Sequence, residues 1–386
     1  MLRKLLLASA GAGKSERIAK EALERAAKGH KVLLLTYTIN NQRELIRHIC
    51  RLNTFLPSNV AVKGWFSFLL EDMVRPYQNI LIQERVSGIV LDSSNPHLGR
   101  DGHGRTFHIP RRAEKVGGQF NPKHFVTEDN RAHTYYLAKL ASVINSQTQG
   151  MPSRRLAEIY NSVFIDEIQD LVGWDFMVIR AMVDTSISEF DFVGDFRQSV
   201  YQTSETKKKP QTISEKVTEF KNMGFKIDTL ATSWRCIQSI CDLADRLHAS
   251  DGIHVPTKSR VITVPSQYSN HLGVFAVSAS HIEDYIKAYN PIILRWDRSS
   301  KKQFCEGRTA YNFGESKGLS FDRVLIIPPD KHAKFLGGDT TAFHGTSTDD
   351  SRNKLYVGIT RARYSVAFWH SGGSVISGAK VWNPAQ

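Results

Sequence analysis

The stretch ASAGAGKS at residues 8–15 constrains the fold of this chain more than any other. It follows the pattern G-x-x-x-x-G-K-[ST] of a phosphate-binding loop, with alanine at the first glycine position. A leucine run at 5–7 precedes it, and a stretch with Glu and Lys or Arg four residues apart follows it and stops at Gly29. Strand, glycine-rich turn and helix are the context that such a loop needs, so we expect an α/β fold with a parallel sheet.

The residue types of this loop suit the binding of a nucleoside triphosphate. Gly11 and Gly13 allow the backbone to turn its N–H groups toward phosphate oxygens. Lys14 would reach the β- and γ-phosphates, and the Ser15 hydroxyl would coordinate Mg²⁺. The residues that we expect to bind the nucleotide here are Ala10, Gly11, Ala12, Gly13, Lys14 and Ser15. The loop alone leaves kinase, GTPase, transporter ATPase and motor open.

The same opening residues also resemble a secretory signal peptide, because a basic pair precedes the leucines. A signal peptide needs an apolar region of about 7–15 residues, which this short run does not provide. Four cysteines are scattered without a Cys-x-x-Cys pair, which favours reduced thiols and a cytoplasmic protein. No segment approaches the ~20 apolar residues of a membrane span, so no membrane partner is expected.

The chain is strongly basic. Its 51 Lys and Arg residues outnumber 38 Asp and Glu residues, and the formal net charge is +13. Such a surplus favours a polyanionic partner, usually nucleic acid, although a solvated basic surface would give the same composition.

Two adjacent carboxylates follow an apolar run in VFIDEIQD at 163–170. A strand over 163–165 would end at Asp166, which could hold Mg²⁺ through water. Glu167 would then be the base for an attacking water molecule. A solvated strand end is the alternative, but the apolar residues before the pair favour burial.

Further stretches occur in the order of the motifs of the UvrD/Rep-like helicases of superfamily I, which this chain resembles. The phosphate loop matches their first motif, and 166–170 matches their second. The other matching stretches are 36–40 (TYTIN), 65–68 (WFSF), 193–201 (VGDFRQSVY), 230–236 (LATSWRC), 317–322 (KGLSFD) and 355–362 (LYVGITRA). An ordered set of motifs over almost the whole chain is far more specific than any one of them.

The resemblance implies that the nucleotide is ATP and assigns roles outside the loop. Gln198 would sense the γ-phosphate, and Arg235 and Arg361 would contact it as arginine fingers do. Trp234 would stack on adenine, and Gly318 would lie at the nucleotide. Taken alone, an arginine would be read as a surface cation and a tryptophan as a core residue; the order of the motifs favours the functional interpretation.

The resemblance also implies a surface for single-stranded DNA. Such surfaces combine basic grooves with aromatic platforms on which bases stack. The candidates are Thr36, Tyr37, Trp65, Phe66 and Tyr201. Each aromatic side chain could equally be packed in a core.

The predicted fold class is α/β, with two tandem RecA-like P-loop NTPase domains and a small insertion in the first. The expected strands are 4–8, 32–36, 60–62, 163–165 and 190–193, then 260–264, 272–276, 291–294, 324–327 and 366–369. We place the first domain at 1–74 and 135–225, an insertion resembling a reduced 1B subdomain at 75–134, and the second domain at 226–386. ATP would lie between the two domains.

The insertion is rich in Gly, His and Arg. It could contact a nucleic-acid backbone through its arginines, or it could be a mobile surface loop. The arginines concerned are Arg100, Arg105, Arg111 and Arg112.

These features predict an ATPase that moves on single-stranded DNA, 3′-to-5′ by the resemblance. The segment between Trp296 and Tyr311 is too short for the 2B insertion of full-length helicases, so unwinding of a tailed duplex should be weak or need a protein partner such as a nuclease. One alternative is a nucleotide-dependent switch or loading subunit of a larger complex. Another is a nucleotide kinase, which would not need Gln198. Whether the strand is DNA or RNA stays open.

Overall fold

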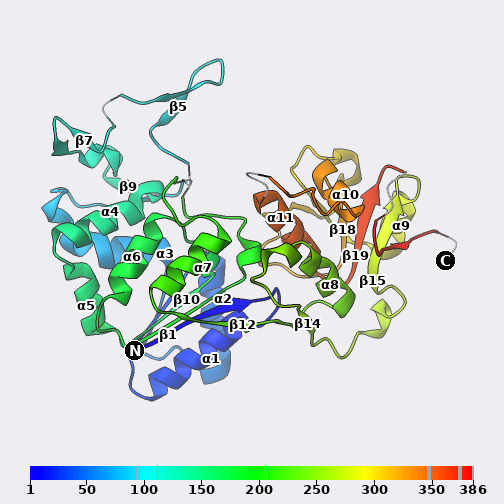
Figure 1. Cartoon of the computed structure of the whole chain (residues 1–386), viewed down its shortest axis with the longest axis horizontal. Helices are drawn as coiled ribbons and strands as arrows, with labels where there is room; N and C mark the ends of the chain where they lie inside the picture. Colours follow the sequence, from blue (N-terminus) through cyan, green and yellow to red (C-terminus); the bar gives the residue numbers. More distant parts are fainter. Residues whose placement is uncertain (93, 111, 205, 346–348, 373–375, 385–386) are drawn as a thin grey trace. The chain divides into compact units, whose positions relative to one another are not determined.

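The computed structural model describes the chain apart from residues 93, 111, 205, 346–348, 373–375 and 385–386 (Figure 1). The described residues form two compact units. Unit 1 comprises Met1–Leu6, Lys14–Gly194 and Tyr201–Asp228, and unit 2 comprises Leu7–Gly13, Asp195–Val200 and Thr229–Gln386. The chain therefore passes from one unit to the other within the phosphate loop and again after residue 194.

Unit 1 is built on a six-stranded sheet. Its strands, in spatial order, are β12 (Lys226–Leu230), β1 (Leu2–Ala8), β11 (Glu189–Gly194), β10 (Ser162–Asp166), β2 (Val32–Thr36) and β3 (Val60–Gly64). β10 pairs in parallel with both β11 and β2, and β2 pairs in parallel with β3. β2 and β10 are buried along their whole length, which explains why their sequences are almost continuously apolar.

Helices follow these strands. They are α1 (Lys14–Ala27), α2 (Ile39–Asn53), α3 (Trp65–Phe68), α4 (Thr134–Gln147), α5 (Met151–Ile159), α6 (Trp174–Val183) and α7 (Ile213–Asn222). α1 buries a stripe of small and apolar residues that includes Ile18 and Ala22, and it carries Glu16 in its first turn, where the helix dipole favours an acid. The Thr38 side chain caps α2 by accepting from the Asn41 N–H.

The segment between β3 and α4 carries short strand pairs that extend from unit 1 (Figure 1). They are β4 (Gly88–Val90) with β9 (Arg131–His133), β5 (Leu98–Arg100) with β6 (Thr106–His108), and β7 (Lys115–Val116) with β8 (Gln119–Phe120). β5 and β6 form an antiparallel hairpin, as do β7 and β8. The β6, β7 and β8 strands of these hairpins are largely exposed, because two-stranded pairs of this size bury little apolar surface, whereas Phe125 and Ala132 of the same segment are buried in the core.

Unit 2 has its own six-stranded sheet, in which every neighbouring pair is parallel. Its strands, in spatial order, are β17 (Ala310–Asn312), β16 (Ile292–Arg295), β18 (Phe321–Ile326), β19 (Ala362–His370), β15 (Gly273–Ser278) and β20 (Lys380–Val381). Its helices are α8 (Gln238–Arg246), α9 (Ile282–Tyr289), α10 (Asp330–Leu336) and α11 (Asp349–Ile359).

Alternate residues of these strands belong to two separate cores. Val324 and Ile326 of β18 pack in the core that includes α8, α10 and α11. Leu325 packs in the other core, with Ile282 and Tyr285 of α9. The period of two along a buried strand thus distributes the apolar side chains between the two faces of the sheet.

The expected α/β fold class is confirmed, because each unit is an α/β structure on a six-stranded sheet. The expected strand at 260–264 is wrong: these residues are irregular, and Ile262 is 91% exposed. β13 (Thr232–Ser233) and β14 (Lys258–Ser259) pair nearby as a minimal two-stranded sheet. Among the described residues, no helix combines the length and the apolar character that crossing a bilayer demands.

Candidate functional site

Four polar side chains of unit 1 meet at the end of β10 and the start of α1. Lys14 Nζ lies 3.4 Å from Glu167 Oε1, and the Ser15 hydroxyl donates to Asp166 Oδ2 at 3.0 Å. We call these four residues the lysine–carboxylate cluster. The loop and the acidic pair, which are far apart in sequence, therefore come together through the sheet.

The backbone after β10 turns sharply to present Glu167. This residue has φ +57°, in the left-handed region that a non-glycine residue seldom adopts, and such strain is common at functional sites. Its N–H donates to Asp166 Oδ1 at 2.9 Å, and Gln169 Nε2 donates to its Oε2. Gly194 at the end of β11 leaves room for this turn, because a Cβ at that position would overlap Gln169 Oε1.

Asp166 is 2% exposed. Burial, with a further contribution from the neighbouring Glu167 carboxylate, raises the pKa of Asp166 to about 7. A buried carboxylate beside a serine hydroxyl offers the oxygen ligands that Mg²⁺ prefers, and a divalent cation would offset the burial cost of the charge. Ser15 and Asp166 therefore fit the metal that the sequence predicted for them.

In unit 2, residues of the phosphate loop contact the segment that carries two predicted nucleotide residues. The Trp234 N–H donates to the Gly11 carbonyl at 2.9 Å. A Cβ on Gly11 would lie 2.5 Å from Arg235 Cβ, and Gly11 has φ +72°, so both space and backbone require glycine here. Trp234 is 64% exposed, and its indole face is thus available to stack on a base.

The remaining loop residues are tightly placed. The Ala10 N–H donates to the Tyr356 hydroxyl at 3.4 Å, and the Ala12 N–H donates to the Ser9 carbonyl at 3.2 Å. Gly13 adopts φ +76° before α1 begins. Ala8 is the last residue of β1, where the extended conformation suits any side chain, so its departure from the glycine pattern costs nothing in backbone strain.

Arg361 is buried and engaged by protein groups. Its guanidinium donates to Gln198 Oε1 at 3.1 Å, and it also donates to the Val357 and Leu319 carbonyls and to the Thr360 hydroxyl. Burial, together with the charge of Arg235, lowers the pKa of Arg361 to about 9. This guanidinium would have to exchange a protein acceptor for a phosphate oxygen to act as a finger.

The other predicted residues of unit 2 lie close to Arg361. Arg235 Nη1 donates to the Thr360 carbonyl at 3.3 Å. Gln198 Nε2 donates to Asp195 Oδ2 at 2.7 Å while its carbonyl accepts from Arg361. Gly318 has φ +85° in the exposed turn before β18, next to the residue whose carbonyl Arg361 bonds.

Arg197 organises this region, although its sequence pattern predicted no role for it. Arg197 is 1% exposed and donates to Asp195 Oδ1 at 3.1 Å, to Asp245 Oδ1 at 2.8 Å and to Ser9 Oγ at 2.9 Å. Its guanidinium also lies over the Tyr356 ring, 4.7 Å from the centroid. The one sequence signal was the charged pair Asp195 and Arg197 between apolar residues.

Part of the predicted nucleic-acid surface forms an aromatic group in unit 1. The rings of Tyr37 and Phe66 meet edge-on with centroids 5.8 Å apart, and the Tyr37 hydroxyl donates to the Gln202 carbonyl. The neighbouring Tyr201 is 41% exposed. Burial raises the pKa of Tyr37 to about 12. Thr36 is buried at the end of β2.

Trp65 corrects the sequence-based expectation. It is 1% exposed, and its Nε1–H donates to Asp175 Oδ1 at 2.7 Å. Its face is covered by protein, so it is a core residue and offers no platform to a base. The apolar body and polar tip of tryptophan suit this position, where a buried carboxylate needs a donor.

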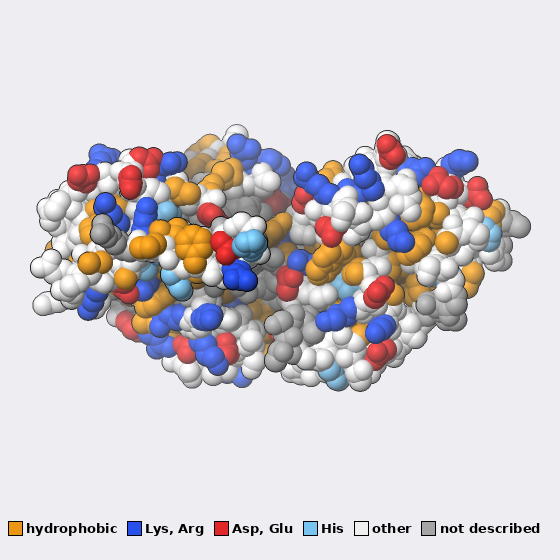
Figure 2. All heavy atoms as spheres, turned by 90° about the horizontal axis from the view of Figure 1, so that it is seen from above, with side chains coloured by type: hydrophobic (Ala, Val, Ile, Leu, Met, Phe, Trp, Pro, Cys, Tyr) orange, Lys and Arg blue, Asp and Glu red, His pale blue; other side chains and the backbone are white. Residues whose placement is uncertain are grey.

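The arginines of the insertion differ in exposure. Arg105 is exposed on the turn of the β5–β6 hairpin, and Arg112 Nη1 donates to the Lys123 carbonyl. Arg111 and the side chain of Arg100 lie outside the described residues. Phe107 of the same hairpin is 48% exposed. On the face in Figure 2, basic side chains alternate with acidic and apolar ones and form no single patch.

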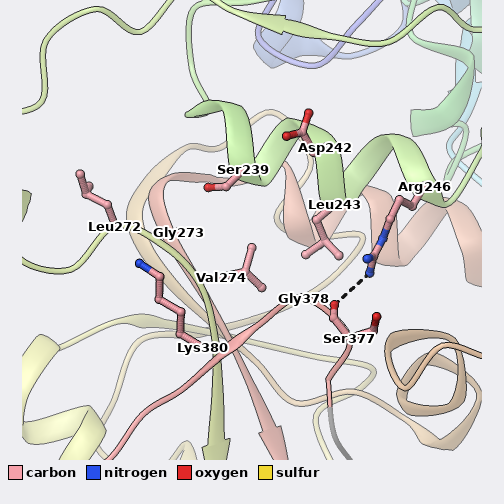
Figure 3. A pocket seen from close by; sticks show the side chains of 10 residues that line it. All are labelled: Ser239, Asp242, Leu243, Arg246, Leu272, Gly273, Val274, Ser377, Gly378 and Lys380. Atoms are coloured by element: carbon pink, nitrogen blue, oxygen red, sulfur yellow. Dashed lines mark hydrogen bonds between the residues drawn. The ribbon is translucent and has the colours of Figure 1, made fainter. Parts of the chain in front are cut away.

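A separate hollow of about 300 Å³ lies beside α8 in unit 2 (Figure 3). Its lining includes Ser239, Arg246 and Lys380, and Arg246 donates to the Ser377 carbonyl. None of its lining residues was predicted to bind nucleotide or nucleic acid.

No protein-family model matches the chain, and no curated protein matches it in sequence. Among solved structures, the chain is similar to the arterivirus nonstructural protein 10, a helicase in complex with DNA, with a TM-score of 0.47 and 11% sequence identity. The match covers 97% of this chain and 62% of that chain. A similarity of this size carries no argument about function, which therefore depends on the chemistry of the site.

Proposed function

We propose that this chain is an ATP-hydrolysing motor that moves along single-stranded DNA, as the superfamily I helicases do. The observation that carries the proposal is the lysine–carboxylate cluster beside the phosphate loop, with Lys14 3.4 Å from Glu167 and Ser15 3.0 Å from Asp166. A lysine, a hydroxyl and two carboxylates at the end of a glycine-rich loop are the set that phosphoryl transfer to water requires.

In this proposal Lys14 exchanges Glu167 for the β- and γ-phosphates when nucleotide binds. The released Glu167 carboxylate, oriented by Gln169, then accepts a proton from the attacking water. Ser15 and Asp166 would hold Mg²⁺, which when bound supplies positive charge to the phosphate oxygens. Arg235 and Arg361 offer two more cations for charge that develops during transfer.

The indole of Trp234 supports the choice of a purine nucleotide, because an exposed flat face beside Gly11 is suited to stacking. For the DNA strand we propose Tyr37, Phe66 and Tyr201 as stacking residues, with Arg105 of the hairpin as a backbone contact. Movement 3′-to-5′, and unwinding that is weak or depends on a partner, are proposed from the motif resemblance.

The test is ATP hydrolysis by the full chain without nucleic acid, with single-stranded DNA and with single-stranded RNA. We expect DNA to stimulate hydrolysis at least tenfold and Lys14→Ala to remove it. Phosphate transfer to an acceptor instead of water would indicate a kinase and contradict the proposal. Hydrolysis that appears only with a protein partner would favour the switch or loading subunit.

Duplexes with a 3′ or a 5′ single-stranded tail test the output of the motor. We expect slow strand separation of the 3′-tailed duplex and none of the 5′-tailed one. Efficient separation of the 3′-tailed duplex by the protein alone would contradict partner dependence, and preference for the 5′ tail would reverse the proposed direction.

A further inference from the structure

The hydroxyl of Tyr356 on α11 joins the phosphate loop to a buried carboxylate. It accepts a hydrogen bond from the Ala10 N–H at 3.4 Å and donates one to Asp195 Oδ2 at 3.0 Å. All three residues belong to unit 2, and Tyr356 is 1% exposed. Burial raises the pKa of Tyr356 well above its usual value, so the hydroxyl keeps the proton that it donates.

The same carboxylate oxygen continues the chain of hydrogen bonds to Arg361. Asp195 Oδ2 also accepts from Gln198 Nε2 at 2.7 Å, and Gln198 Oε1 accepts from Arg361 Nη2 at 3.1 Å. An unbroken series of contacts thus leads from a loop N–H through a tyrosine, an aspartate and a glutamine to the buried arginine. Hydrogen bonds in such series strengthen or weaken one another.

The Arg197 guanidinium fixes the groups around Tyr356 by several contacts. Arg197 bonds the other oxygen of Asp195, and the same guanidinium bonds Ser9 at the start of the loop. It also lies over the Tyr356 ring. Among these hydrogen bonds of Tyr356, Asp195, Gln198 and Arg197, the 3.4 Å bond from the Ala10 N–H is the longest. A hydrogen bond of that length is weak and is the easiest to replace.

Backbone N–H groups of a phosphate loop turn toward phosphate oxygens when nucleotide binds. In this structure the Ala10 N–H has the Tyr356 hydroxyl as its acceptor. The hydroxyl oxygen therefore stands where a phosphate oxygen would satisfy the same donor. A bound nucleotide would therefore compete with Tyr356 for this N–H.

We propose that Tyr356 is a positioning residue that occupies the Ala10 N–H when no phosphate is bound and links the state of the loop to Gln198 and Arg361. When phosphate takes the N–H, the hydroxyl no longer accepts and donates more weakly to Asp195. The hydrogen bond from Gln198 Nε2 to Asp195 Oδ2 then becomes stronger. This bond orients the Gln198 amide, whose oxygen faces Arg361. The coupling is reciprocal, so a change at Gln198 also alters the affinity of the loop. This inference rests on the proposed nucleotide site.

The test is the affinity of Tyr356→Phe for ADP, which occupies the loop but has no γ-phosphate. Removing the competing acceptor should tighten ADP binding about twofold to tenfold, the range expected for loss of one neutral hydrogen bond. Turnover with ATP should fall, so kcat and KM would both decrease. Damage to the fold alone would weaken binding.

Tyr285→Phe is the matched control. Tyr285 is an equally buried tyrosine of unit 2, but it packs in the core on the α9 face of the sheet, away from the loop residues. We expect its replacement to leave ADP affinity unchanged. Equal affinities of Tyr356→Phe and the wild type, or equal tightening in both variants, would overturn the proposal.

Two measurements separate this inference from the proposed motor. In a double-mutant cycle with Gln198→Ala, the effects on ADP affinity should be non-additive by at least about threefold, and additivity would refute the link. In the wild type, ADP should change amide hydrogen exchange at 195–200 as well as at 7–13; a change confined to 7–13 would also refute it, even if Tyr356→Phe failed to fold. Neither needs hydrolysis, so both remain informative if DNA-stimulated ATPase activity is absent.

Discussion

The polar groups of the two units are prepared for nucleotide in different ways. In unit 1, the proposed phosphate ligand Lys14 faces the proposed base Glu167, and the two proposed metal ligands Ser15 and Asp166 face each other. In unit 2, Arg361 and Gln198 are bonded to main-chain groups and to Asp195. Nucleotide can bind the groups of unit 1 by taking the place of their present partners. In unit 2, the hydrogen bonds of Arg361 and Gln198 must first rearrange. We therefore expect the Lys14 ammonium group of unit 1 to contribute most to affinity, and Glu167 together with the cations of unit 2 to set the rate.

Lys14→Ala should have the largest effect. Without this ammonium group the phosphates lose a cation and Glu167 loses its ion-pair partner, so hydrolysis should fall below detection and ATP affinity should drop. Equilibrium binding and phosphate release measure the two effects. Lys20→Ala, on the exposed side of the same helix, is the control. Normal affinity in Lys14→Ala would break the assignment of binding to unit 1.

Arg361→Ala should lower kcat about 10³-fold with little change in ATP affinity, as expected for an arginine finger. Steady-state kinetics and nucleotide binding measure this difference. An unchanged kcat would show that Arg361 has only a structural role. A large loss of affinity would instead show that Arg361 contributes to nucleotide binding, as Lys14 of unit 1 is expected to do.

Glu167→Gln should lower kcat by about 10²- to 10³-fold while ATP stays bound, because an amide cannot accept the proton of water. The amide keeps the shape of the side chain, so the variant isolates proton transfer from packing. Single-turnover hydrolysis and filter binding provide the measurements. Normal turnover would remove Glu167 from the base role and leave the rate entirely to unit 2.

Trp65→Phe should have the smallest effect on function. The change leaves buried Asp175 without one of its donors, and this should cost about 1–3 kcal/mol of unfolding free energy. DNA affinity should stay the same, whereas Tyr201→Ala, at an exposed ring, should weaken it several-fold. Denaturant unfolding and fluorescence anisotropy measure the two quantities. Weaker DNA binding by the Trp65→Phe variant would instead support the original prediction that Trp65 is a stacking platform for a base.

Much of the scaffold could be predicted because its signals are local. The apolar runs of β2 and β10 are continuous, and both strands formed where the pattern placed them. The run at 260–264 is also rich in β-branched residues, but it is irregular and its side chains are not buried. β17 was missed because three residues give too short a pattern to recognise.

The sequence by itself determined the phosphate loop, the acidic pair after a buried strand and the α/β class, because each depends on residues that are neighbours in the chain. The tertiary structure alone decided that Trp65 is a core residue, that Arg361 is saturated by protein acceptors and that Tyr356 bonds Ala10. These outcomes depend on burial and on partners distant in sequence. Residue spacing carries no information about such partners until the sheets bring them together.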